Sequence, residues 1–552
     1  MKKTMKIDLS SDRLIAIAAD LVEEHNYISA LKMLNKNAER NVNDEDSYML
    51  YAEIFDDMGL YEKCINGWFK YIDSTLSDDL SEAYEGLAVA YMNIGEEEIS
   101  ACYYDKLLKN SAELDAQTRR EIFGTFISKE QNPLKFVYPP KLADYSDVIT
   151  SGMACMREGE YDKAIEEFEQ VEEENDAYIS ARNYIAMCDI ITDRNEQAEQ
   201  ECLAILEKKP DSVDALITLA AVKTEQGKNE ESRKIAQKLL SLDLTSSEER
   251  YKIATVCCEN KMHAEAFELF CKLENELLYD RSVMYFKAVS AFNSGNYEES
   301  FTEFDKILTI YPDSVTARHH YEKAREYAES GEQKELSYFY RLPIEMRENL
   351  LKTLSAFVKF KTGELKKLFE VADATDCIAW CFDETDSYDD IELQFLGCLC
   401  ALKAGMDGIV SDVLLNAFLS DLLKTRVLVL LGERNEYNSF GVVLCHLYRR
   451  IEFRALDLGR LKKKSFVSAY ARLVAHFAFL DGSLSEKFAV SAENLYKKLE
   501  SENRLSCASD VDALTAAVYF NAELERSLMK KEDIFSFFDT TENKTKNILG
   551  DL

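Results

Sequence analysis

Hydrophobic and small residues recur along most of this chain at the spacing of an α-helix, in pairs of short segments separated by a tight turn. In the stretch 145–175, one apolar stripe runs through Gly152, and a turn that carries Gly159 follows it. A second stripe then runs from Ala164 to Phe168. This pattern predicts two helices that fold back on each other as a hairpin.

The hairpin pattern repeats every 34 residues. Each unit carries a small residue in its first helix and a second small residue 12 positions later. The first small residues of the five most regular units are Gly152, Ala186, Ala220, Ala254 and Ala288. Less regular units precede them around Ala18, Ala52 and Ala88. Short side chains allow antiparallel helices to approach within about 8–10 Å. The period therefore predicts stacked hairpins that bury one continuous core.

A small residue, a Gly-x-Tyr turn and an Ala-x-x-x-Phe stretch, in that order, resemble the tetratricopeptide repeat. The turn reads Gly59–Leu60–Tyr61, Gly159–Glu160–Tyr161 and Gly295–Asn296–Tyr297. The resemblance implies an all-α, right-handed solenoid of helix hairpins whose first helices line a concave groove. It also implies that the groove binds a protein or peptide, and it brings no enzymatic activity with it.

The repeats divide the chain into five predicted parts. These are about three repeats over 11–110, a degenerate repeat or bridge over 111–146, five regular repeats and a following helix over 147–335, an irregular helical domain over 338–533, and a tail over 534–552. Pro133, Pro139 and Pro140 forbid a normal second helix in the bridge. After Pro343 no proline occurs, and no Asn-Gly or Asp-Gly signal lies between alternating runs, so we expect helices throughout. We expect the helical domain to cover the end of the solenoid, and the tail to be frayed.

The net charge of −35 is unevenly distributed: residues 1–337 carry −30 and residues 338–552 carry −5. An acidic repeat half repels DNA and anionic membranes and favours basic partners; charge that serves solubility alone is the alternative. No apolar run has the length of an export signal or a membrane span. The fourteen cysteines show no disulfide-like framework, which favours the cytoplasm. The oligomeric state stays open.

No sequence motif supports catalysis, a cofactor or a metal. Glycine-rich phosphate loops, a nucleophile elbow and a zinc-protease motif are all missing from the sequence. Cys377 and Cys381 have an allowed metal-ligand spacing, but Cys398 and Cys400 point to different faces of a helix. Buried thiols are the better interpretation.

The groove can be located from the register of the small residues. First-helix positions that face away from the second helix are apolar, with methionine and aromatic residues among them. The predicted partner-binding residues are Ile149, Met153, Asn183, Met187, Ile217, Tyr251, Tyr285 and Phe292. Such a surface suits an amphipathic or hydrophobic segment. The alternative is that neighbouring units or the C-terminal domain already bury it.

One basic cluster occurs in the C-terminal half: Arg449, Arg450, Arg454, Arg460, Lys462, Lys463 and Lys464. It could be a solvated face, a surface that docks on the acidic repeats, or a site for a phosphate-rich partner. For the whole chain, the sequence favours a protein-interaction scaffold without enzymatic activity. A peptide-gated regulator and a helical enzyme domain at the C-terminus are the alternatives.

Overall fold

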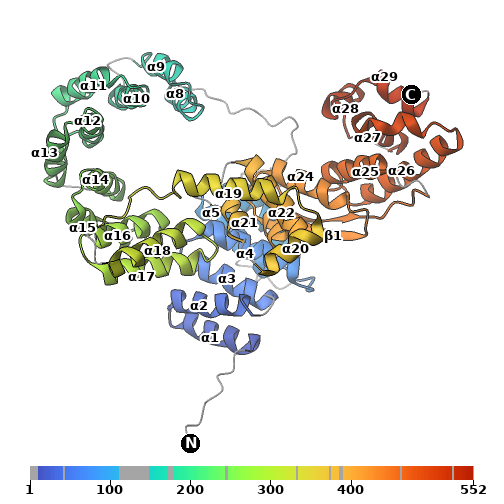
Figure 1. The fold of residues 1–552 in the computed structure, drawn as a ribbon, viewed down its shortest axis with the longest axis horizontal. Coiled ribbons are helices and arrows are strands. Elements are labelled where there is room, and N and C mark those ends of the chain that lie inside the picture. The colour runs from blue at the N-terminus through green and yellow to red at the C-terminus, as the bar shows by residue number, and fades with distance from the viewer. Residues whose placement is uncertain are drawn as a thin grey trace, which may run out of the picture. The chain divides into compact units, whose positions relative to one another are not determined.

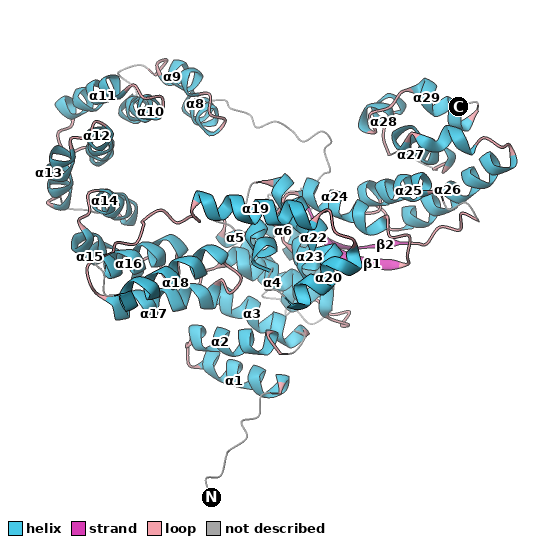
Figure 2. Ribbon diagram, in the orientation of Figure 1, coloured by secondary structure: helices cyan, strands magenta, loops and turns pink. Residues whose placement is uncertain are grey.

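The structure, a computed structural model, describes residues 10–40, 44–110, 148–171, 178–242, 246–330, 334–371, 375–383, 390–459, 463–524 and 528–550. The predicted bridge over 111–146 lies outside these residues. The chain forms two compact units. Unit 1 comprises Met1–Leu134, Asp313–Thr316 and Arg341–Leu552, and unit 2 comprises Lys135–Pro312 and Ala317–Tyr340. Almost all of the regular structure is helical, so the prediction of an all-α repeat fold is confirmed (Figure 2).

The helices of the repeats form two arrays. The first array contains α1 (Ser11–Glu23), α2 (Tyr27–Ala38), α3 (Glu45–Asp57), α4 (Tyr61–Ser74), α5 (Ser81–Asn93) and α6 (Glu97–Asn110). The second array contains α8 (Val148–Arg157), α9 (Tyr161–Phe168), α10 (Tyr178–Ile191), α11 (Asn195–Lys208), α12 (Val213–Glu225), α13 (Asn229–Leu240), α14 (Ser247–Glu259), α15 (His263–Glu274), α16 (Arg281–Asn293), α17 (Tyr297–Ile310) and α18 (Val315–Ser330).

The small residues lie where the two helices of a hairpin cross, as predicted. A Cβ atom added to Gly152 would lie 2.5 Å from Phe168, so only glycine fits at that crossing. Phe168 is buried and stacks on Tyr184 of the next hairpin, with 5.2 Å between the ring centroids. At two hairpins a serine at the second small position donates its hydroxyl to the backbone of the first helix: Ser100 Oγ to Ala88 O at 2.7 Å, and Ser232 Oγ to Ala220 O at 2.9 Å.

Each described hairpin turns through one residue with left-handed backbone conformation. Glycine supplies it at Gly59, Gly95, Gly159, Gly227 and Gly295. His25, Asp193 and Lys261 adopt the same conformation at the equivalent positions of other hairpins. A common turn geometry keeps the register of the stack even where glycine is replaced.

Unit 1 also contains the C-terminal half of the chain, beginning at α19. Its elements are α19 (Ile344–Phe357), α20 (Thr362–Val371), α21 (Thr375–Ala379), η1 (Trp380–Phe382), α22 (Ile391–Ala404), α23 (Asp407–Leu415), α24 (Asp421–Gly432), β1 (Asn438–Leu444), β2 (Leu447–Phe453), α25 (Lys464–Phe477), α26 (Ser483–Ser501), η2 (Leu505–Ser509), α27 (Val511–Asn521), α28 (Lys531–Phe537) and α29 (Glu542–Leu549). One large apolar core joins most of them.

The expectation of helices throughout this half is wrong at one place. Strands β1 and β2 pair antiparallel, and Leu444 lies opposite Leu447. Cys445 and His446 make the two-residue turn, both with positive φ. Such a turn usually carries Asn-Gly, so its sequence signal is missing here. The alternation of exposed Arg450 and Glu452 with buried Ile451 and Phe453 was the remaining signal.

The expectation of a frayed tail is also wrong. Residues 534–549 form most of α28 and all of α29, and Ile534, Phe538 and Ile548 are buried in the C-terminal core. These apolar side chains supply the burial that keeps a chain terminus ordered.

The β-hairpin packs on the last helices of the first array, within unit 1. Val443 joins the apolar cluster that contains Phe69 and Tyr91. Tyr103 Oη donates to the carbonyl oxygen of His446 at 2.6 Å. Asn66 on α4 accepts a hydrogen bond from the backbone of Ala417 at 2.9 Å. An array of stacked hairpins needs such a cover, because its last unit otherwise exposes an apolar face.

Candidate functional site: the inner face of the second array

The second array curves so that its first helices lie on the inside of an arc. Figure 1 shows α10, α12 and α14 on the inner side, with α11, α13 and α15 outside them. We call the side chains that α8, α10, α12, α14 and α16 present to the inside of this arc the inner face. The predicted groove residues all belong to these five helices.

The predicted groove residues fall into two groups. Met187 is 38% exposed, and Ile149, Met153, Asn183, Ile217 and Tyr251 are partly exposed. Tyr285 and Phe292 are buried, so for these two positions the structure agrees with the alternative that other parts of the chain already cover them. Asn183 is already engaged, because its Oδ1 accepts a hydrogen bond from Thr218 Oγ1 at 2.9 Å. The open part of the inner face therefore belongs to α8–α14.

Tyr285 is buried because a later part of unit 2 lies on it. We call residues 334–340 the cover segment. The side chain of Asn293 on α16 makes two hydrogen bonds with the backbone of this segment, one as donor and one as acceptor. Asn293 Nδ2 donates to Leu336 O at 3.0 Å, and Leu336 N donates to Asn293 Oδ1 at 2.7 Å. Tyr285 Oη donates to Ser337 O at 2.7 Å.

The side chains of the cover segment alternate as in a β-strand. Leu336 is buried and Tyr338 and Tyr340 are half-buried, whereas Ser337 and Phe339 are exposed. The ring of Tyr340 stacks on Tyr285 with 4.0 Å between centroids. Tyr338 Oη lies 2.8 Å from His263 Nδ1. An ion pair of 2.8 Å joins Lys261 to Glu335. The inner face thus holds an extended segment through its main chain and through alternate side chains.

The open part of the inner face is acidic at the positions equivalent to Asn293. Glu259 and Glu225 end α14 and α12, 34 and 68 residues before Asn293. Neither carboxylate forms an ion pair with a described residue. The surrounding protein desolvates the carboxyl of Glu259 and raises its pKa, and Glu225 raises it further. Two neighbouring carboxylates without a cation favour the approach of a basic group.

The basic cluster is used mainly inside unit 1. Arg450 donates to Asp73 Oδ1 at 2.7 Å and to Asp73 O at 2.9 Å. Of the predicted cluster, Arg450 thus contacts an acidic residue of the first array. Arg454 forms an ion pair with Glu486, and Lys463 donates to Leu505 O. Lys464 is exposed at the start of α25. Arg460 and Lys462 lie outside the described residues.

The cysteines of the C-terminal half are buried rather than arranged as ligands. Cys377, Cys381, Cys398 and Cys400 have raised pKa values, chiefly because burial disfavours the thiolate. In the described part of the chain, no three His, Cys, Asp or Glu side chains are placed to hold a metal ion. Among the same residues, no helix is both long and apolar enough to cross a membrane.

Sequence reasoning missed the cover segment, Asn293 and the pair Glu225 and Glu259. The alternation through Leu336, Tyr338 and Tyr340 was a signal for an extended segment. The 34-residue period that located the apolar groove positions also makes Glu225, Glu259 and Asn293 equivalent positions of three successive repeats.

Comparison with known proteins gives matches of low sequence identity and low TM-score. No protein-family model matches the chain, and no curated protein matches it in sequence. A tetratricopeptide repeat protein from Parabacteroides merdae is 15% identical, covering 51% of this chain and 99% of its own, with a TM-score of 0.24. The tetratricopeptide repeat domain of P58(IPK) is 12% identical, covering 59% of this chain and 99% of its own, with a TM-score of 0.20. Cut9–Hcn1 of the APC/C is 12% identical, covering 98% of this chain and 96% of its own, with a TM-score of 0.25. No partner or activity follows from likenesses at this level.

Proposed function

We propose that this chain, whose helix hairpins resemble tetratricopeptide repeats, is a protein-interaction scaffold that binds an extended, basic and apolar segment of a partner protein. The binding surface is the open part of the inner face, on α8–α14. The proposal is for binding and assigns no catalysis to the chain.

One observation carries the proposal: the inner face already binds an extended segment of its own chain. Asn293 and Tyr285 make three hydrogen bonds to the backbone of Leu336 and Ser337. Main-chain hydrogen bonds supply affinity for an extended segment, and alternate side chains supply specificity. The cover segment contacts α14 through Cys258, α15 through His263, and α16 through Tyr285 and Asn293. The same face continues onto the helices that precede them.

The side chains of the open part indicate the chemistry of the partner. At the position of Tyr285, the preceding repeats carry Tyr251 and Ile217. With Met187 they offer an apolar surface to a partner's side chains. Glu225 and Glu259 stand beside it without ion pairs to described residues. A segment with lysine or arginine at alternate positions would satisfy both features.

Charge reversal tests this proposal with random peptides in place of a natural partner. The full chain and its Glu225→Lys/Glu259→Lys variant would each select peptides from a displayed random library. We expect the unaltered chain to enrich lysine, arginine and apolar residues. The variant should enrich aspartate and glutamate instead, and should bind a peptide selected by the unaltered chain about tenfold more weakly or worse.

Two exposed glutamates on outer helices provide the matched control. The Glu230→Lys/Glu268→Lys variant carries the same change in net charge on α13 and α15. It should select the same peptides as the unaltered chain. Identical selection by all three proteins would refute the proposed surface.

A second candidate function, gating by a peptide, is favoured by the cover segment itself. A partner that displaced residues 334–340 would free Tyr285 and Asn293 for its own backbone. Neighbouring repeats contact only one another, so such a displacement could change the pitch of the array. X-ray scattering with and without a selected peptide measures it; an unchanged profile at saturation would eliminate gating.

The proposed location is the cytoplasm. It is supported by fourteen free cysteines, most of them buried, because unpaired thiols persist in a reducing compartment. Fractionation of the native host would test this location.

A further inference from the structure

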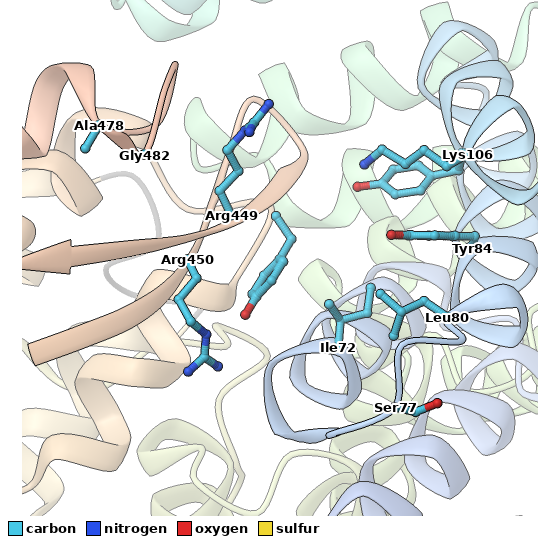
Figure 3. Close-up of a pocket in the computed structure, with 11 residues that line it drawn as sticks. Ile72, Ser77, Leu80, Tyr84, Lys106, Arg449, Arg450, Ala478 and Gly482 are labelled. Carbon is cyan, nitrogen blue, oxygen red and sulfur yellow. The ribbon is translucent and has the colours of Figure 1, made fainter. Parts of the chain in front are cut away.

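A cavity of about 350 Å³ lies in unit 1 between the end of the first array and strand β2. Its walls come from α4 to α6, from β2 and from the connection between α25 and α26. The lining residues are Ile72, Ser77, Leu80, Tyr84, Tyr103, Lys106, Tyr448, Arg449, Arg450, Ala478 and Gly482. Figure 3 shows Lys106 and Tyr84 reaching from the helices toward the strand that carries Arg449 and Arg450. A volume of this size can hold a small organic molecule.

The cavity is cationic although the chain as a whole is strongly acidic. Lys106, Arg449 and Arg450 line it, and none of the described lining residues is a carboxylate. Arg450 is neutralised by Asp73 behind the wall, at 2.7 Å. Arg449 lies 5.7 Å from the ring centroid of Phe479 and has no ion pair with a described residue. Hydrogen bonds in its own turn lower the pKa of the exposed Asp481 carboxylate, and Arg449 is close enough to lower it further, without forming an ion pair. Among the described residues, Lys106 therefore stays without an acidic partner, and Arg449 keeps its charge at the mouth of the cavity.

Lys106 is held by aromatic rings rather than by an anion. Its Nζ lies 4.5 Å from the ring centroid of Tyr103 and 5.6 Å from that of Tyr84. No hydrogen bond or ion pair connects this amine to a described residue. Burial lowers the pKa of Lys106, and Arg449 lowers it further, while Cys102 acts in the opposite direction. An ammonium group that is largely removed from water, beside a second cation, is stabilised by a bound anion.

The remaining wall is apolar and aromatic. Ile72 and Leu80 line it together with Tyr84 and Tyr103, whose rings are tilted by 36° with centroids 6.2 Å apart. Tyr103 Oη is used by the backbone of His446, as described above. The hydroxyl of Tyr84 has no hydrogen-bond partner among the described residues, and Figure 3 shows it directed into the cavity. One wall can thus receive a planar or apolar body, and the other receives a charge.

We propose that this cavity binds a small organic anion, a phosphate monoester or a carboxylate. Its acidic group lies between Lys106 and Arg449, and its apolar body lies against Leu80 and Tyr84. The alternative is that the cluster around Arg449 is only a solvated basic face. That alternative does not explain Lys106, which belongs to the first array and lies over two tyrosine rings. The site is in unit 1, so it stands or fails independently of the inner face of unit 2.

Calorimetry on the full chain tests the proposal with four probes: phenyl phosphate, benzoate, inorganic phosphate and benzyl alcohol. We expect phenyl phosphate or benzoate to bind with one-to-one stoichiometry, and inorganic phosphate and benzyl alcohol to bind at least about tenfold more weakly. The better of the first two probes distinguishes a phosphate site from a carboxylate site. Failure of both organic anions to bind at millimolar concentration would overturn the proposal, as would equal binding of inorganic phosphate.

Variants locate the site. Lys106→Met keeps the apolar stem on the tyrosine rings and removes the charge, so it should weaken binding about tenfold while the melting temperature is retained. Arg449→Gln should act in the same direction. Lys109→Met is the matched control, because Lys109 lies one turn further along α6 and pairs with Asp105 at the surface. Equal loss of binding in the Lys106 and Lys109 variants would refute the site.

The pH dependence of binding provides a readout that a structural role for Lys106 would not change. The titratable and charged groups that face its amine are Cys102, Tyr103, Tyr84 and Arg449. Burial raises the pKa values of the first three, and an arginine stays charged. Binding should therefore weaken in the unaltered chain as the pH rises through the lowered pKa of Lys106, and stay constant over the same range in Lys106→Met. An identical pH dependence in both would contradict the proposal.

Discussion

The two arrays use the same helix hairpin but differ in what lies on them. In unit 1, the last helices of the first array are covered by a folded hairpin whose Val443 enters their apolar cluster. In unit 2, a segment of seven residues lies on α14 to α16 through hydrogen bonds and aromatic contacts. No described residue of unit 2 covers the inner face of α8–α12 in the same way. The first cover is part of a core, whereas the second leaves most of its face open. The same repeat thus packs against a folded hairpin in one array and keeps much of its inner face exposed in the other.

The largest effect is expected where the cover of the first array enters the core. Val443→Asp places a carboxylate in a fully buried apolar position. We expect the free energy of unfolding of unit 1 to fall by about 4 kcal/mol or more, because a buried acid without a partner is among the costliest substitutions. Denaturant unfolding followed by circular dichroism measures the loss.

The same substitution at Val490 is the control. Val490 lies on α26 in the same unit and is 44% exposed. Its change to aspartate should alter stability by about 0.5 kcal/mol or less. Comparable losses in both variants would show that the hairpin is no more embedded than a surface helix.

A smaller loss of stability is expected when the pH is lowered. It arises at the C-terminal helices, which belong to unit 1 like the first array. His476 packs edge-on against Phe537 of α28, with 4.8 Å between ring centroids. Burial, with a contribution from Arg472, lowers the pKa of His476 to about 4. The unfolded chain has a pKa of about 6.5 and so binds more protons between pH 6.5 and pH 4. Stability should fall as the pH decreases through this window, by at most about 3 kcal/mol.

Replacing the histidine isolates this contribution. In His476→Gln, no proton is taken up at this position, so the free energy of unfolding should change less between pH 6.5 and pH 4 than in the unaltered chain. Denaturant titrations at several pH values would show the difference. Parallel pH profiles for the two proteins would mean that His476 is not desolvated in the folded state.

In the second array, Asn293 makes two of the three hydrogen bonds that Asn293 and Tyr285 form with the backbone of the cover segment. Asn293→Ala removes both hydrogen bonds to Leu336, so we expect the segment to open more often, at a cost of about 2 kcal/mol in local stability. Amide hydrogen exchange at Leu336 should then become faster by about tenfold or more. Asn275→Ala is the control, because Asn275 bonds only to the carbonyl oxygen of Cys271 in its own helix. Unchanged exchange at Leu336 in Asn293→Ala would show that the segment is held by its aromatic contacts alone.

The sequence predicts the arrays well because their signals are local. Small residues such as Gly152 and Ala164 recur in phase, and each hairpin contains both of its crossing residues within a few helical turns. The turn positions follow the same register, and that register is kept where Lys261 replaces glycine. The core of each hairpin is therefore visible as a periodic pattern.

The covers were not predicted because they join residues that are distant along the chain. The hairpin that carries His446 meets Tyr103, 343 residues earlier. Leu336 meets Asn293, 43 residues earlier, and neither position stands out without its partner. Burial of Tyr285 follows from this contact, so periodicity alone could not show that this position of the predicted groove is covered. A pattern of one element shows which face is apolar and does not show what covers it.

The smallest effect is expected at a turn of the second array, where a substitution changes only the strain in the backbone. Gly227 has a φ of +72°, and a Cβ atom there would meet nothing within 4 Å. Gly227→Ala should therefore destabilise unit 2 by about 1 kcal/mol, purely because an L-residue resists this conformation. Gly408→Ala has equally free surroundings and a helical backbone on α23, so it should be neutral or slightly stabilising. Thermal unfolding of the two variants compares them directly. Equal melting temperatures for the two variants would mean that this turn position tolerates other residues, as the equivalent positions tolerate Lys261 and His25. The register of the second array would then depend on the helix crossings.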